Sequence, residues 1–223
     1  MCVYGFAETY KSWLTQEMAF NLVTGEPWIG YTTHKCKVAL IQVEQTESNY
    51  RNRVEDWVKA RHVKPNDVND KMLFINEIGL RLDTVNGQQF VEHEISQFIP
   101  DVMIVDCLYK TANENDQTSL TRYLGFVSHI RQAYGVAVVT VHHPRKESRD
   151  RNGAETDMGL NELSGYSALE RDLETVLRVY HISKRQDKTL LRLNWQKTRN
   201  TKGDIGDVSV KWNPNKLGFD LLN

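Results

Sequence analysis

Short apolar runs alternate along this chain with longer segments of helical periodicity. A continuous apolar run bounded by polar residues suits a strand buried on both faces, and apolar positions three to four residues apart suit an amphipathic helix. Strands that alternate with helices indicate a parallel sheet covered by helices. The pattern therefore predicts an α/β fold.

The first half of the chain carries this alternation most clearly. We expect strands at residues 2–4, 37–44, 72–78, 102–106 and 136–142, and helices from Lys11 to Gly25 and at 46–61, 87–99 and 117–134. The first strand is shorter than a usual buried parallel strand, so we expect the natural chain to extend further at its start.

After Leu173 the pattern changes to strands without long helices between them. We expect strands at residues 176–182, 189–197, 208–212 and 217–221, joined by short turns at 185–188 and 213–216 that predict antiparallel hairpins. The polar segment from Pro144 to Ser164 is too long for an ordinary connection, and such loops are usually functional.

Composition narrows the class of protein. With 223 residues, 40% of them hydrophobic, the chain predicts a single domain over residues 1–223. The net charge of -1 gives no global attraction to nucleic acid, so such binding needs a local patch. Three cysteines without paired spacing favour a reducing cytoplasm, and no apolar run approaches the ~18 residues that span a bilayer.

The chemistry begins with Gly5-x-x-x-x-Tyr10-Lys11-Ser12, between the first strand and the first helix. Such a loop cradles phosphate, with Lys11 reaching the β- and γ-phosphates and Ser12 holding Mg²⁺. Tyr10 stands where the motif usually has glycine, and a plain strand–turn–helix is the alternative. The residues predicted to bind ATP are Gly5, Phe6, Ala7, Glu8, Thr9, Tyr10, Lys11, Ser12 and Trp13.

Three later apolar strands end in side chains that suit phosphate chemistry. Asp106 can hold Mg²⁺ near Ser12, and Glu44 can act as a general base or orient the attacking water. His142-His143 ends the third strand, where one imidazole can hydrogen-bond the γ-phosphate or its attacking water. Metal ligation by histidine is the rival interpretation, but no HxxxH motif or cysteine partner is present.

Two basic segments lie later in the chain. Lys197 and Arg199 alternate at the end of a strand, where they can stabilise γ-phosphate charge in the same or a neighbouring subunit, or form a solvated hairpin tip. The segment 144–151 follows the histidine strand directly, and its cations are candidates for the nucleic-acid backbone, although its acids also fit a solvated loop.

The ordered set of segments GFAETYKSWL, VALIQVE, PDVMIVDCLYK, VAVVTVHHPRK, GYSALERDLETVLRV and QKTRNTKG resembles the RecA-like ATPases, and more narrowly the RepA-type hexameric replicative helicases and their AAA-25 relatives. The resemblance covers residues 1 to about 203. It implies a RecA-like P-loop core, a mostly parallel twisted sheet flanked by helices with C-terminal antiparallel strands.

The same resemblance implies roles for single residues. Lys11 and Ser12 bind phosphate and Mg²⁺, Glu44 is the catalytic carboxylate, Asp106 is the metal-side aspartate and His143 is the γ-phosphate sensor. Lys197 and Arg199 act as fingers across a subunit interface in a ring, expected to be a hexamer. Lys146, Arg149 and Arg151 become candidates for single-stranded DNA contact, and the turn at 165–168 is structural and phosphate-responsive.

Three functions compete at this point. The first is an ATP-driven motor on single-stranded DNA, a helicase or helicase-related ATPase of a plasmid, phage or mobile element. The second is an ATP-gated binding, loading or recombination regulator that does not unwind DNA, which the near-neutral charge favours. The third is a small-molecule kinase, for which 144–151 is the only candidate lid.

Overall fold

Nine strands form one sheet, in the order β3-β2-β4-β5-β1-β6-β7-β8-β9. This is a computed structural model, and it describes residues 1–113, 115–143, 172–183, 187–199 and 205–222. The α/β class predicted from the sequence is confirmed, and the sheet has a parallel and an antiparallel part.

The first six strands run parallel to one another. They are β1 (Cys2–Tyr4), β2 (Val38–Gln42), β3 (Met72–Asn76), β4 (Val102–Asp106), β5 (Ala137–His142) and β6 (Thr175–Ser183). In the register, Gln42 lies opposite Asp106 and Tyr4 lies opposite His142. The carboxyl ends of four adjacent strands therefore meet at one edge of the sheet, where open α/β sheets bind ligands.

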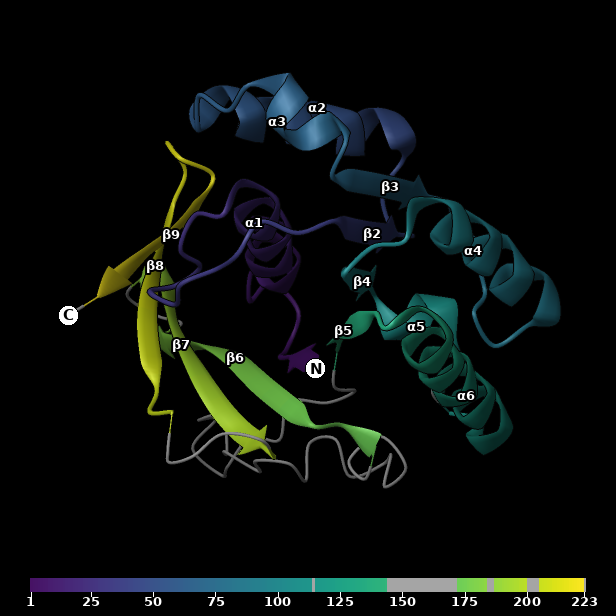
Figure 1. Cartoon of the computed structure of the whole chain (residues 1–223). Helices are drawn as coiled ribbons and strands as arrows, with labels where there is room; N and C mark the ends of the chain where they lie inside the picture. Colours follow the sequence, from purple (N-terminus) through teal and green to yellow (C-terminus); the bar gives the residue numbers. More distant parts are fainter. Residues whose placement is uncertain (114, 144–171, 184–186, 200–204, 223) are drawn as a thin grey trace, which may run out of the picture.

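The last three strands complete the sheet as hairpins. They are β7 (Asp187–Thr198), β8 (Val208–Asn213) and β9 (Gly218–Leu222), and each pairs antiparallel with the strand before it. This confirms the predicted switch to antiparallel pairing. Figure 1 shows these strands curving around the first helix.

Helices cover both faces of the parallel part (Figure 1). One face carries α1 (Lys11–Thr24), α2 (Glu47–Ala60) and α3 (Pro65–Asn69), and the other carries α4 (Val85–Phe98), α5 (Leu108–Thr111) and α6 (Gln117–Tyr134). Helix α1 ends at Gly25, which has φ 78 and donates its N–H to the Asn21 carbonyl at 2.8 Å. Glycine reaches this left-handed conformation without a Cβ clash, so the predicted helix end is confirmed.

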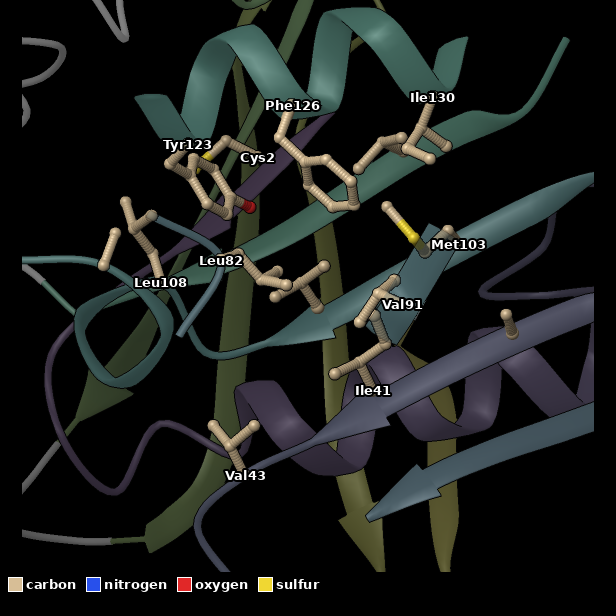
Figure 2. Close-up of a cluster of buried hydrophobic side chains, with 14 of the residues drawn as sticks. Cys2, Ile41, Val43, Leu82, Val91, Met103, Leu108, Tyr123, Phe126 and Ile130 are labelled. Carbon is tan, nitrogen blue, oxygen red and sulfur yellow. The ribbon is translucent and has the colours of Figure 1, made fainter. Parts of the chain in front are cut away.

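The sheet separates two apolar cores. Figure 2 shows the core under α6, where Tyr123, Phe126 and Ile130 are directed toward strand residues that include Met103 and Ile41. The alternation of inward and outward side chains along each strand sends the intervening residues to the other core. There, Phe20 of α1 stacks on Trp57 of α2 with ring centroids 3.9 Å apart.

A buried ion pair ties α1 and α2 to the C-terminal hairpin. The Glu17 carboxylate accepts hydrogen bonds from the Arg61 guanidinium and from the Phe219 N–H, the latter at 3.2 Å. A Cβ at Gly218 would lie 2.2 Å from Glu17, so the strand approaches this pair as closely as a backbone can. The hairpin β8–β9 is thereby fixed beside the middle of α1.

Several boundaries differ from the prediction. The strand expected at residues 37–44 ends at Gln42, because the Gln42 side-chain oxygen accepts the N–H groups of Glu44 at 2.7 Å and Gln45 at 3.0 Å. Helices α3 and α5 were not predicted, since four or five residues carry too little periodicity to be recognised. Among the described helices, none combines the length and the apolar character needed to cross a membrane.

Candidate nucleotide-binding site

The loop between β1 and α1 lies against the backbone of β6. A Cβ at Gly5 would meet the Val179 carbonyl oxygen at 2.2 Å, which no side chain tolerates. Glycine at this position therefore lets the loop begin directly on the neighbouring strand. The loop is positioned by β5 and β6 as much as by the three residues of β1.

Lys11 is the buried cation of this loop, with 2% of its surface exposed. Its ammonium donates to the Phe6 carbonyl at 2.5 Å and to Thr9 Oγ1 at 3.2 Å, and the Thr9 hydroxyl donates to Phe6 at 2.9 Å. Burial lowers the pKa of Lys11 to about 8. The ammonium thus lies inside the curve of the loop with little charge compensation, which suits a polyanionic ligand.

Tyr10 occupies the position that the motif usually gives to glycine. Its φ of 57 is left-handed, and it is the N-cap of α1 without a side-chain cap. The strain of that conformation, of order 1 kcal/mol, is offset by ring contacts. The Tyr10 ring stacks on Trp212 of β8 at 5.3 Å and meets Phe219 of β9 edge-on at 6.4 Å. The phosphate loop is therefore anchored to the C-terminal hairpin.

Asp106 lies at the end of β4 beside Ser12. Burial raises the pKa of the Asp106 carboxyl to about 6, although a hydrogen bond from Ser12 opposes the shift. Its Oδ1 atom is buried and has no hydrogen-bond partner within the described part of the chain. A buried carboxylate oxygen without a donor, next to a serine hydroxyl, fits a hard cation such as Mg²⁺.

Glu44 follows β2 by two residues and is exposed. The Gln42 side chain holds the backbone turn that takes Glu44 out of the strand. Its carboxylate accepts a hydrogen bond from the Tyr109 hydroxyl, which α5 supplies. Glu44 is thus a carboxylate held at the open side of the same edge.

Of the two histidines, His143 belongs to the site and His142 to the interior. His143 lines the cavity beside the loop, whereas His142 is fully buried on β5. Burial lowers the pKa of His143 to about 4, with the Lys11 charge acting in the same direction. Its Nε2 atom is buried and finds no partner among the described residues, so a neutral imidazole faces the site with an unused hydrogen-bonding atom.

A cavity of about 450 Å³ lies beside the phosphate loop and reaches Lys11, Ser12 and His143. Its lining consists of residues 8–13 with Gln45, Arg53, His143 and Lys188. Arg53 and Lys188 were not predicted. Lys188 lies at the exposed rim, 3.9 Å from Glu8, whereas Arg53 reaches in from α2.

Arg53 is the functional candidate that the sequence analysis missed. Its guanidinium lies 3.5 Å from the centre of the Trp13 ring, and its Nε and Nη2 atoms are buried without partners in the described structure. Burial lowers the pKa of Arg53 to about 10, so it is charged at neutral pH. The spacing in the sequence could have indicated that Arg53 points inward. Tyr50, Arg53 and Trp57 are three and four residues apart and share the inward face of α2.

A larger groove of about 610 Å³ lies between α4 and α6. Both of its acids have partners: Asp83 pairs with Arg81, and a Glu92 oxygen lies 2.6 Å from His129 Nε2. None of the strand ends that carry Lys11, Asp106 or His143 lines it. Size alone therefore does not locate the site.

Lys197 and Arg199 lie at the other edge of the sheet. Lys197 pairs with Val176 and Thr198 with Thr175, the first residue of β6, and Arg199 lines a cavity at the amino ends of the strands. The structure therefore does not bring them to the Lys11 site of their own chain. The predicted nucleic-acid residues Lys146, Arg149 and Arg151, and the turn at 165–168, lie outside the described residues.

Comparison with known proteins agrees with this geometry. The sequence profile of the AAA-25 family, described as an AAA domain, matches residues 1–149, which contain the phosphate loop and the ends of β2, β4 and β5. The search of curated proteins gives no match. The family consists of ATPases of the P-loop class, which bind nucleotide with residues such as Lys11. The chain belongs to the AAA-25 family of P-loop ATPases.

Proposed function

We propose that this chain is a Mg²⁺-dependent ATPase motor of the RepA type, which assembles into a ring and acts on single-stranded DNA. The observation that carries the proposal is the division of charges between the two edges of the sheet. Lys11, Asp106, Glu44 and His143 meet at one edge, and Arg199 lies at the other. A finger at that second edge reaches only the site of a neighbouring subunit.

The chain's own residues divide the chemistry among them. Lys11 and the loop N–H groups bind the phosphates, and Ser12 and Asp106 hold Mg²⁺. The ion, when bound, neutralises phosphate charge. Glu44 orients the attacking water and takes its proton, while the bond between the γ-phosphorus and the bridging oxygen breaks.

His143 and Arg53 complete this edge. The neutral imidazole of His143 hydrogen-bonds the γ-phosphate or its attacking water, and it is followed directly in the sequence by the basic segment 144–151. Arg53 offers unpartnered N–H groups to developing phosphate charge. We propose Lys146, Arg149 and Arg151 as the contacts to single-stranded DNA.

Glu44→Gln tests the proposal, with Glu47→Gln as the matched control. Both side chains are exposed acids near the start of α2, but Glu44 lies close to His143 and accepts the Tyr109 hydroxyl, whereas Glu47 pairs with Arg51. Phosphate release from ATP and Mg²⁺ is measured with and without single-stranded DNA, and the assembly state is determined in the same samples.

We expect turnover that rises with DNA, falls at least 100-fold in Glu44→Gln and stays within twofold in Glu47→Gln. An assembled wild type that binds ATP but releases no phosphate would identify a nucleotide-gated binding module instead. Phosphate found on a small acceptor would identify a kinase.

A further inference from the structure

Three side chains of different chemistry meet beside the phosphate loop. A Glu44 carboxylate oxygen, the Cys107 sulfur and a His143 ring nitrogen all lie within 4.8 Å of one another. They come from the segments that follow β2, β4 and β5, so their proximity results from the strand order and not from a sequence motif. We propose that these three residues form a Zn²⁺ site whose occupation switches off the ATPase.

The separations are close to those of a metal site. Bond lengths of about 2.0–2.3 Å to nitrogen, oxygen and sulfur place tetrahedral ligands about 3.5 Å apart. The three ligand atoms lie at most 4.8 Å apart, so shifts of about 1 Å in each ligand atom bring them to that separation. Glu44 is exposed and His143 is half-buried, which gives an ion access to the fully buried Cys107.

The donor set selects the metal. Sulfur, imidazole nitrogen and a single carboxylate suit Zn²⁺, whereas Mg²⁺ requires oxygen ligands. Binding replaces the proton of the Cys107 thiol by the metal, and the proton leaves to solvent. Three protein ligands leave the fourth position of the ion to solvent.

Surrounding contacts hold the ligands in place. The Tyr109 hydroxyl donates to the Glu44 carboxylate, and the Tyr109 ring meets the His143 ring edge-on at 5.5 Å. Groups that orient the ligands in this way strengthen metal binding. From the sequence, metal ligation is the rival interpretation of the histidine pair, which shows no HxxxH motif or cysteine partner, but the fold supplies Cys107.

The effect on catalysis rests on the proposed function. A metal at this cluster occupies the carboxylate of Glu44 and the free nitrogen of His143, so neither can act on water or phosphate. Lys11, Ser12 and Asp106 are outside the cluster and stay available to nucleotide. Zinc therefore lowers the turnover rate and leaves ATP binding intact.

Metal binding is measured first, without nucleotide, so its result does not depend on ATPase activity. The wild type, Cys107→Ser and the control Cys36→Ser are titrated with Zn²⁺ against a chromophoric chelator. Cys36 is a half-buried free cysteine that does not belong to the cluster. We expect one ion per chain for the wild type and Cys36→Ser, and at least tenfold weaker binding for Cys107→Ser.

Cobalt substitution then identifies the ligand. Co²⁺ should give a thiolate charge-transfer band in the wild type and in Cys36→Ser, and none in Cys107→Ser. Equal Zn²⁺ affinity in all three proteins, or a cobalt spectrum without that band, would overturn the proposal. Circular dichroism on the same samples separates loss of a ligand from loss of the fold.

Phosphate release is measured last. Zinc should inhibit the wild type and Cys36→Ser with an unchanged apparent affinity for ATP, a chelator should reverse the inhibition, and Cys107→Ser should resist it. Inhibition that is equal in Cys107→Ser would also overturn the switch. Zinc binding without any ATPase activity would leave the metal site standing and remove the proposed function alone.

Discussion

The charged groups at the two edges of the parallel sheet differ in burial and in pairing. At the carboxyl edge Lys11 and Asp106 are buried, and their pKa values move to about 8 and about 6, each toward the neutral form. At the amino edge Arg131 pairs with Glu174 at 3.0 Å with both side chains exposed, and Asp101 accepts the Lys37 N–H at 2.8 Å. The first edge holds buried charges that the fold compensates only in part, as expected where a charged ligand supplies the missing partner.

The largest effect expected from this difference concerns ATP affinity. Lys11→Ala should weaken ATP binding by about 10³-fold, because it removes the cation inside the loop. Arg199→Ala, at the other edge, should leave the affinity of the unassembled chain within twofold. Calorimetry with a non-hydrolysable analogue checks both, and an equal loss in the two variants would show that the edges are not separate.

Asp106→Asn should stabilise the protein. The pKa of Asp106 is about 6 in the folded chain and 3.8 ordinarily, so the ionised form costs folding as much as about 3 kcal/mol at pH 7. The folded state takes up this proton first as the pH falls. The gain in Asp106→Asn should therefore be complete above pH 6 and vanish near pH 4, as measured by urea unfolding.

The amino edge provides the control for that measurement. Glu174→Gln alters an exposed ion pair and should change the free energy of unfolding by less than about 1 kcal/mol at any pH. Asp106→Asn that is less stable than the wild type at pH 7 would mean that the carboxyl edge is compensated after all.

The smallest effect expected is that of Arg53. Arg53→Ala should weaken binding of the ATP analogue by about 10-fold to 100-fold, the value of a hydrogen bond to a charged group. Arg51→Ala is the matched control, since Arg51 lies two residues earlier on the exposed side of α2. Analogue affinity that is equal in the two variants would reduce Arg53 to a packing partner of Trp13.

Much of the fold could be predicted because its signals are local. Strand β4 and helix α6 match their predicted bounds, the first as a continuous apolar run and the second as a segment of helical periodicity. The phosphate loop could be proposed for the same reason, since the strand, the glycine and the Lys11-Ser12 pair follow one another closely in the sequence.

What could not be predicted depends on the order of the strands. Cys107 lies beside His143 because β4 and β5 are neighbours, and no local pattern encodes that adjacency. Arg53 enters the cavity because α2 packs over the carboxyl edge. The sequence likewise places Arg199 near a strand end without saying at which edge that end lies.

The aromatic contacts around the phosphate loop have an optical consequence. Trp13 carries the Arg53 guanidinium on its face at 3.5 Å and meets Trp212 at 4.8 Å, and Trp212 in turn stacks on Tyr10 of the loop. Indole emission responds to a nearby charge and to ring contacts. Two of the five tryptophans therefore form an intrinsic fluorescence reporter next to the phosphate loop, and ligand binding can be followed without a label.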